Sequence, residues 1–172
     1  LEDANAYDAA DEIPQGLEAR FVYNWSGTMV YNGKVYDNIT YRLRGANGRY
    51  LTDGKRSMRF RFNDGYWFEP LDQDGQPYEE KWKTLTTGKG FDNRQTLTYA
   101  LNEAMTMLLS NMMGLPAPDT HWFQFRVIDG AAEAPDQWRG DFWGVNFAME
   151  DYDKRFLDAH GLEAGNLYKL IN

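Results

Sequence analysis

Two stretches of the chain place an arginine at every second position, with bulky apolar residues between them. ITYRLRG holds Arg42 and Arg44, and KRSMRFRF holds Arg59 and Arg61 in the same relation. Successive side chains of a strand point to opposite faces, so the arginines share one face and the apolar residues share the other. The pattern predicts a β-sheet with one core face and one arginine face.

These four arginines indicate an anionic ligand or internal acidic partners. An arginine stays protonated, and its planar donors suit phosphate and carboxylate groups. The chain has 26 acidic and 18 basic residues and a formal net charge of -8. This charge argues against a nucleic-acid-coating protein and against a polybasic membrane binder. A ligand site and a solvated face paired with acids are both open at this point.

Size and residue content narrow the class of protein further. A chain of 172 residues with 42% apolar content is long enough for one domain with a sizeable core. It has no cysteine, which excludes disulfides, thiolate zinc sites and cysteine nucleophiles. No apolar run approaches the roughly 18 residues of a membrane span. With only His121 and His160, a histidine-rich metal site is not expected, and both are predicted to pack or to lie at the surface.

The order of elements predicts an α+β fold. Residues 1–18, rich in Ala, Asp and Glu, are predicted to form a linker or arm, and residues 19–172 a domain. Asn32-Gly33 between two runs of strand formers predicts a hairpin with a primed turn. Another strand is predicted over 55–62, followed by a long irregular stretch to about Asn93.

The second half of the chain contains the clearest helix. It is predicted from about Arg94 to Met113 and ends at Gly114 and Pro116. Its helical spacing predicts one buried stripe, made of Leu97, Leu101, Met105, Leu108 and Met112. Strands are predicted in HWFQFRVID, DFWGVNFAM and NLYKLIN, with a short helix over 153–160. The expected fold is a mainly antiparallel sheet packed against one long helix.

Three runs, in this order, resemble successive motifs of the CotH family, known from spore-coat kinases: YRLRGANGRYLTDGKRSMRFRF, FDNRQTLTYALNEAMTMLLSNMMGLPAP and FWGVNFAMEDYDKRFLDAHGLEAGNLYK. The resemblance covers most of the chain from about Ile39. It implies the small lobe of an atypical kinase-like fold, with residues 19–172 as the N-terminal portion and the catalytic residues downstream of residue 172. It also implies ATP, Mg²⁺ or Mn²⁺, a Ser/Thr protein substrate, and an extracellular or spore-surface location.

Phosphoryl transfer needs cations that clamp the phosphates. Under the resemblance, Arg44, Lys55, Arg59 and Lys169 are the candidates for this contact. Glu103 on the helix is the candidate partner that orients a cation, as in ordinary kinases. The alternative for Glu103 is a surface acid on a helix.

Met149 and Glu150 end an apolar strand where a kinase-like small lobe would touch adenine. Val145 and Phe147 belong to the same strand, and the alternative is that Val145, Phe147 and Met149 form one alternating core face.

Two other functions fit the same sequence. A non-catalytic carbohydrate- or protein-binding module is favoured by 16% aromatic residues. An exposed, coplanar row of Trp67, Trp82, Trp138 and Trp143 would indicate such a module, whereas their burial beside an arginine-lined cleft would favour nucleotide. A structural coat or matrix protein is the third possibility.

Overall fold

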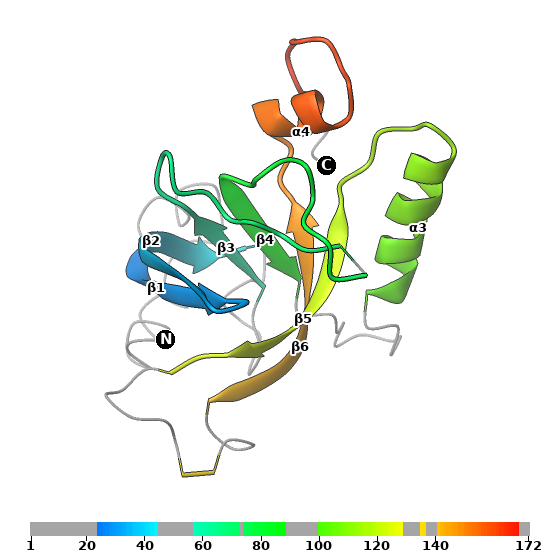
Figure 1. The fold of residues 1–172 in the computed structure, drawn as a ribbon. Helices are drawn as coiled ribbons and strands as arrows, with labels where there is room; N and C mark the ends of the chain where they lie inside the picture. The colour runs from blue at the N-terminus through cyan, green and yellow to red at the C-terminus, as the bar shows by residue number, and fades with distance from the viewer. Residues whose placement is uncertain are drawn as a thin grey trace, which may run out of the picture.

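The computed structural model describes residues 24–44, 57–72, 74–88, 100–128, 135–136 and 141–168. Within them, six antiparallel strands form one sheet in the order β1-β2-β3-β4-β6-β5. The sheet curls into a half-barrel, with α3 beside β5 and α4 beyond the end of β6 (Figure 1). The elements are β1 Trp25–Tyr31, β2 Lys34–Leu43, β3 Met58–Arg61, β4 Thr84–Gly88, α3 Leu101–Met112, β5 Thr120–Arg126, β6 Phe142–Glu150 and α4 Lys154–Ala159. The predicted α+β fold with a mainly antiparallel sheet is confirmed.

The predicted hairpin is present between β1 and β2. Asn32 and Gly33 have φ values of 47° and 75°, the left-handed pair that a primed two-residue turn requires. Tyr31 and Lys34 pair on either side of the turn. The predicted linker over residues 1–18 lies outside the described residues.

Strands β2 and β3 have the two predicted faces. Leu43 lies opposite Met58, and both are 1% exposed. Arg42 lies opposite Arg59 on the other face. Opposed residues of neighbouring strands share a face, so the period-two pattern separates core from arginines as expected.

Strand β4 corrects the prediction of an irregular stretch up to Asn93. It lies between β3 and β6, with Leu85 opposite Phe60. The Thr87 hydroxyl accepts a hydrogen bond from the Met58 backbone N–H at 3.0 Å. A threonine-rich run fits this place because β-branched residues suit a pleated, packed surface.

Helix α3 is shorter than predicted. It begins after Ala100, which has a left-handed φ of 61°, and residues 94–99 lie outside the described part. Its end is as predicted: Gly114 has a φ of 77°, and the Leu115 N–H donates to the Ser110 carbonyl at 2.9 Å. In place of one long helix, the described chain has α3 with 12 residues and α4 with 6.

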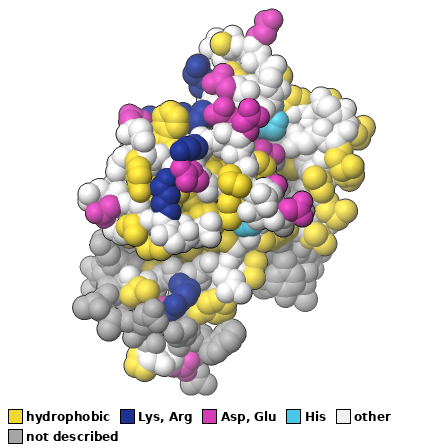
Figure 2. All heavy atoms as spheres, viewed as in Figure 1, with side chains coloured by type: hydrophobic (Ala, Val, Ile, Leu, Met, Phe, Trp, Pro, Cys, Tyr) yellow, Lys and Arg dark blue, Asp and Glu magenta, His cyan; other side chains and the backbone are white. Residues whose placement is uncertain are grey.

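The buried stripe predicted for the helix is wrong over α3. Leu101 and Met105 are about half exposed, at 52% and 49%, and Met112 is 75% exposed. Ala104 is the buried residue of α3, because the helix meets the sheet through Ala104 and Met107 rather than through the stripe. Hydrophobic side chains gather at the right of the molecule, over α3 (Figure 2).

Helix α4 confirms the predicted short helix. The Asp153 carboxylate caps it by accepting the Arg155 backbone N–H at 2.8 Å. The strand predicted in NLYKLIN is not formed by 166–168, which are exposed and irregular, and 169–172 lie outside the described part. Among the described helices, none has the length and apolarity needed to cross a membrane.

Candidate functional site

The arginine face continues across the sheet. The strand registers place Arg59 opposite Thr86, and Thr86 opposite Met149. Arg44 extends the stripe beyond Arg42 and is half-buried, with its backbone N–H donating to the Ser57 carbonyl at 2.8 Å. Cationic side chains of β2 and β3 therefore share one face with the end of β6.

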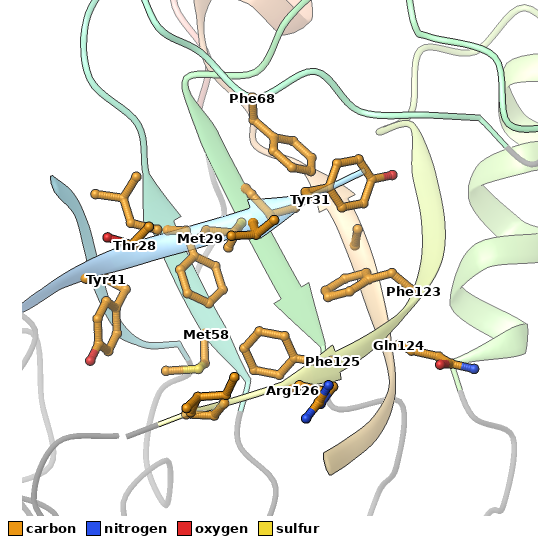
Figure 3. A pocket seen from close by; sticks show the side chains of 18 of the residues that line it. Thr28, Met29, Tyr31, Tyr41, Met58, Phe68, Phe123, Gln124, Phe125 and Arg126 are labelled. Carbon is orange, nitrogen blue, oxygen red and sulfur yellow. The ribbon is translucent and has the colours of Figure 1, made fainter. Parts of the chain in front are cut away.

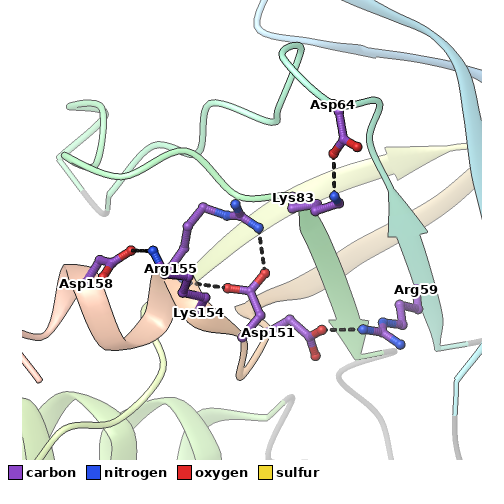
Figure 4. Close-up of polar contacts among 8 residues, drawn as sticks. Arg59, Asp64, Lys83, Asp151, Lys154, Arg155 and Asp158 are labelled. Carbon is purple, nitrogen blue, oxygen red and sulfur yellow. Dashed lines mark hydrogen bonds and ion pairs between the residues drawn. The ribbon is translucent and has the colours of Figure 1, made fainter. Parts of the chain in front are cut away.

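Arg59 forms an ion pair with Asp151, the residue that follows β6 (Figure 4). Both side chains are partly buried, at 38% and 25% exposure. Arg59 thus has the internal acidic partner that was one of the two explanations for the arginines. A phosphate group at this guanidinium would have to displace Asp151 or share Arg59 with it.

Further ion pairs line the same region. Lys83 pairs with Asp64, and the Arg155 guanidinium lies 2.8 Å from an Asp153 oxygen (Figure 4). Arg155 also lies over the Trp67 ring, 4.2 Å from its centroid. Cations and carboxylates are interleaved here, so the region is not a purely basic surface.

Helix α3 covers the other half of the arginine-bearing face. Ala104 packs with Phe147 and Met149, which are 1% and 4% exposed. Val145 is 53% exposed, so only part of the predicted core face of β6 is buried. Met149 therefore lies in the core beneath α3.

The other predicted site residues are less enclosed or lie elsewhere. Glu103 is exposed in the first turn of α3. Burial, and then the charge of Glu103, raise the pKa of Tyr152, which places Glu103 near the segment that follows β6. Lys55 and Lys169 lie outside the described residues. The structure thus brings Arg44, Arg59 and Met149 onto one face.

The Glu150 side chain lies on the face of the sheet opposite the arginines. Glu150 pairs with Leu85, and Leu85 pairs with Phe60 of the apolar face. Glu150 is 3% exposed, and its Oε2 atom lies 3.1 Å from His160 Nε2. The Asp119 backbone N–H donates to the same oxygen at 3.2 Å. One potential ligand atom from each of Asp119, Glu150 and His160 lies within 4.8 Å of the others.

Burial dominates the electrostatics of this group. It raises the pKa of Glu150, against the opposing effect of the hydrogen bond to His160. It also raises the pKa of Asp119, which the charge of His160 partly offsets. Sequence reasoning missed the grouping, since residues 119, 150 and 160 have no recognisable metal-site spacing.

An apolar cavity of about 400 Å³ lies on the concave side of the half-barrel (Figure 3). Residues of β1, β2, β3 and β5 line it, among them Met29, Tyr41, Phe60, Phe123 and Phe125. Arg126, at the end of β5, adds a charged group to the lining. Cavities of this size and character are typical of small-molecule sites.

The tryptophans do not form an exposed row in the described part of the chain. Trp82 is 3% exposed, whereas Trp67 and Trp143 are half-buried. Trp138 lies outside the described residues. The pattern does not favour a sugar-stacking surface.

The nucleotide and metal implied by the CotH resemblance fit the described residues unequally. Guanidinium groups on one face suit phosphates. Mg²⁺, however, prefers oxygen ligands from protein and water. The group around Glu150 includes an imidazole, and it lies on the face of the sheet opposite the arginines. The chain matches no protein-family model, no curated protein and no solved structure.

Proposed function

We propose that the protein is a CotH-like kinase component whose arginine-bearing face binds the phosphates of ATP for transfer to a Ser or Thr hydroxyl of a partner protein. The observation that carries this proposal is the gathering of Arg42, Arg44 and Arg59 on the sheet face that α3 also covers. Phosphoryl transfer depends largely on positioning and charge stabilisation, which such a face can supply. A coat or cell-surface protein is the proposed acceptor.

The residues have distinct proposed roles. Arg44 and Arg59 contact phosphate oxygens, with Lys55 and Lys169 assigned the same role from sequence alone. Glu103 is exposed beside this face and orients one of these cations. Mg²⁺ or Mn²⁺ entering with the nucleotide would neutralise part of the phosphate charge.

The C-terminal end of β6 has an indirect role in the proposed nucleotide site. Met149 is buried on the arginine-bearing face, so its side chain supports the adenine side of the site from within the core, whereas the Glu150 side chain lies on the opposite face and takes no part in the proposed nucleotide site. Asp151 holds Arg59 when nucleotide is absent and releases it to the phosphates when nucleotide binds.

Calorimetric titration with Mg·ATP tests the binding step. Arg44→Ala and Arg59→Ala should each weaken binding about tenfold or more, since a hydrogen bond to a charged group contributes about 1.5–3 kcal/mol. Lys34→Ala is the matched control: it removes one cation from the opposite end of β2, about 30 Å from Arg44. Wild-type protein that binds no ATP, or arginine variants that bind like Lys34→Ala, would refute the proposal.

Transfer itself is followed with radiolabelled ATP and a serine-rich acceptor protein, in Mg²⁺ and in Mn²⁺. Labelled acceptor is expected with a form extended at its C-terminal side, where the resemblance expects the catalytic residues, and not with this chain alone. An extended form that binds ATP but leaves the acceptor unlabelled would reduce the function to nucleotide binding.

The concave cavity favours a second candidate, a non-catalytic module that binds an apolar ligand. Its aromatic lining and its volume of about 400 Å³ suit a small apolar molecule. Ala148 lines the cavity and is 3% exposed, so Ala148→Leu should fill part of it and reduce binding of an apolar fluorescent dye. Val145→Leu, on the same strand but not on the lining, should leave dye binding unchanged. Equal dye binding by both variants would contradict this candidate.

A further inference from the structure

We propose that Asp119, Glu150 and His160 form a binding site for a zinc-class divalent cation that fastens α4 to the sheet. This site is separate from the arginine-bearing face and does not depend on the kinase proposal. It joins three elements: Asp119 precedes β5, Glu150 ends β6, and His160 follows α4.

The backbone already holds the three residues in place. The Glu150 N–H donates to the Asp119 carbonyl at 2.9 Å, which fixes the start of β5 against the end of β6. The His160 ring packs on Phe156 with 4.5 Å between ring centroids, and its Nε2 atom faces Glu150. The three potential ligand atoms lie within 4.8 Å of one another, close enough for a single ion to contact all of them.

One oxygen of Glu150 indicates that this group can bind a cation. Glu150 is 3% exposed, and its Oε1 atom is buried without a hydrogen-bond partner. Buried polar atoms almost always have such a partner, and leaving a charged one without it is costly. The second carboxylate, on Asp119, adds negative charge beside it. A divalent cation would satisfy Glu150 Oε1 and neutralise both carboxylates.

The donor set selects the class of cation. One imidazole nitrogen and two carboxylates suit Zn²⁺, which binds His and Asp or Glu at about 2.0–2.2 Å. Mg²⁺ and Ca²⁺ prefer oxygen ligands alone. Three protein ligands leave one tetrahedral position, which water can fill.

The chain has two histidines, which makes a direct test possible. Titration of ¹⁵N-labelled wild-type protein with ZnCl₂, followed by imidazole NMR, should shift the His160 signals at one equivalent and leave those of His121 in place. EDTA should reverse the shift, and excess Mg²⁺ should not compete. Unchanged His160 signals at saturating Zn²⁺ would overturn the proposal without the need for any variant.

Calorimetry on variants provides the second test. His160→Asn and Asp119→Asn should each weaken Zn²⁺ binding by at least about tenfold, since even residues that only orient metal ligands contribute about 10–100-fold. His121→Asn is the matched control and should keep the wild-type affinity. Circular dichroism checks that each variant is folded. A folded His160→Asn variant that binds Zn²⁺ with wild-type affinity would show that zinc binds elsewhere. A loss of Zn²⁺ affinity in His121→Asn as large as that in His160→Asn would show the same.

Discussion

Strand β2, strand β3 and helix α3 all have regular apolar patterns, but the strands bury their apolar residues and the helix exposes most of its own. Leu43 and Met58 are each 1% exposed, whereas Met112 and Met113 of the helix end are 75% and 76% exposed. The strands have hydrogen-bonded neighbours on both sides and a curled sheet around their apolar face. The helix touches the sheet through a narrow strip at Ala104. Periodicity thus identifies an apolar face, and the neighbouring elements decide whether it is covered.

The largest expected effect comes from the buried side of this comparison. Phe62 is 2% exposed and packs on Phe68 and Tyr36, with 5.1 Å between ring centroids in each pair. Phe62→Ala should lower the free energy of unfolding by about 3–5 kcal/mol, because it removes apolar contacts and leaves a cavity. Urea denaturation measures the change. A loss below about 1 kcal/mol would mean that this core is loosely packed.

A smaller effect is expected where the strands share a polar contact. Thr87→Val keeps the shape of the side chain but removes the acceptor of the buried Met58 N–H. The free energy of unfolding should fall by about 1–3 kcal/mol because that donor loses its partner. Thr87→Ser, which retains the hydroxyl, is the matched control for urea denaturation. A loss in Thr87→Val no larger than that in Thr87→Ser would contradict the role of the hydroxyl as acceptor.

The free energy of unfolding should depend on pH through the ion-paired Glu69 carboxyl. Hydrogen bonds from Lys34, and next from Lys81, lower the pKa of Glu69 to about 2. A carboxyl with a lowered folded-state pKa stabilises the fold above its unfolded-state pKa of about 4.3, and that contribution is lost as the pH falls toward 2. The stability difference between wild type and Glu69→Gln should be constant from pH 7 to about 5.5 and shrink below pH 4.5. A constant difference down to pH 2.5 would contradict the lowered pKa.

The smallest effect is expected on α3. Met112→Gln should change the free energy of unfolding by no more than about 0.5 kcal/mol, because an exposed side chain loses little on substitution. Urea denaturation at two protein concentrations checks this. A loss above about 1 kcal/mol that grows with concentration would show that the helix is covered by another copy in solution.

Local signals in the sequence were sufficient for much of the fold. Asn32-Gly33 set the hairpin because both residues tolerate a left-handed φ, and Gly114 with Pro116 set the end of α3 for similar backbone reasons. The arginine stripe followed from strand alternation alone. Strand β4 was missed because the run from Thr84 to Gly88 does not alternate apolar and polar residues, and Thr84, Leu85, Thr86 and Thr87 are all buried.

The sites were harder to predict than the elements, since they depend on residues far apart in the chain. Strand alternation predicted the stripe of arginines, but the ion pair between Arg59 and Asp151 can be seen only once the sheet register is known. His160 was expected to be a packing or surface residue, and it does pack on Phe156, yet it also meets Glu150. Only the antiparallel pairing of β5 with β6 brings Asp119 to that place.

The exposed end of α3 also has a chemical consequence. In a chain without cysteine, methionine is the sulfur that oxidants can reach, and conversion to the sulfoxide makes an apolar side chain polar. Met105, Met112 and Met113 are open to peroxide, whereas Met58 and Met149 are shielded. Oxidation should therefore modify the methionines of α3 and its C-terminal end before the buried methionines of the sheet. The order in which the sulfoxides form would show which surfaces of the protein are covered.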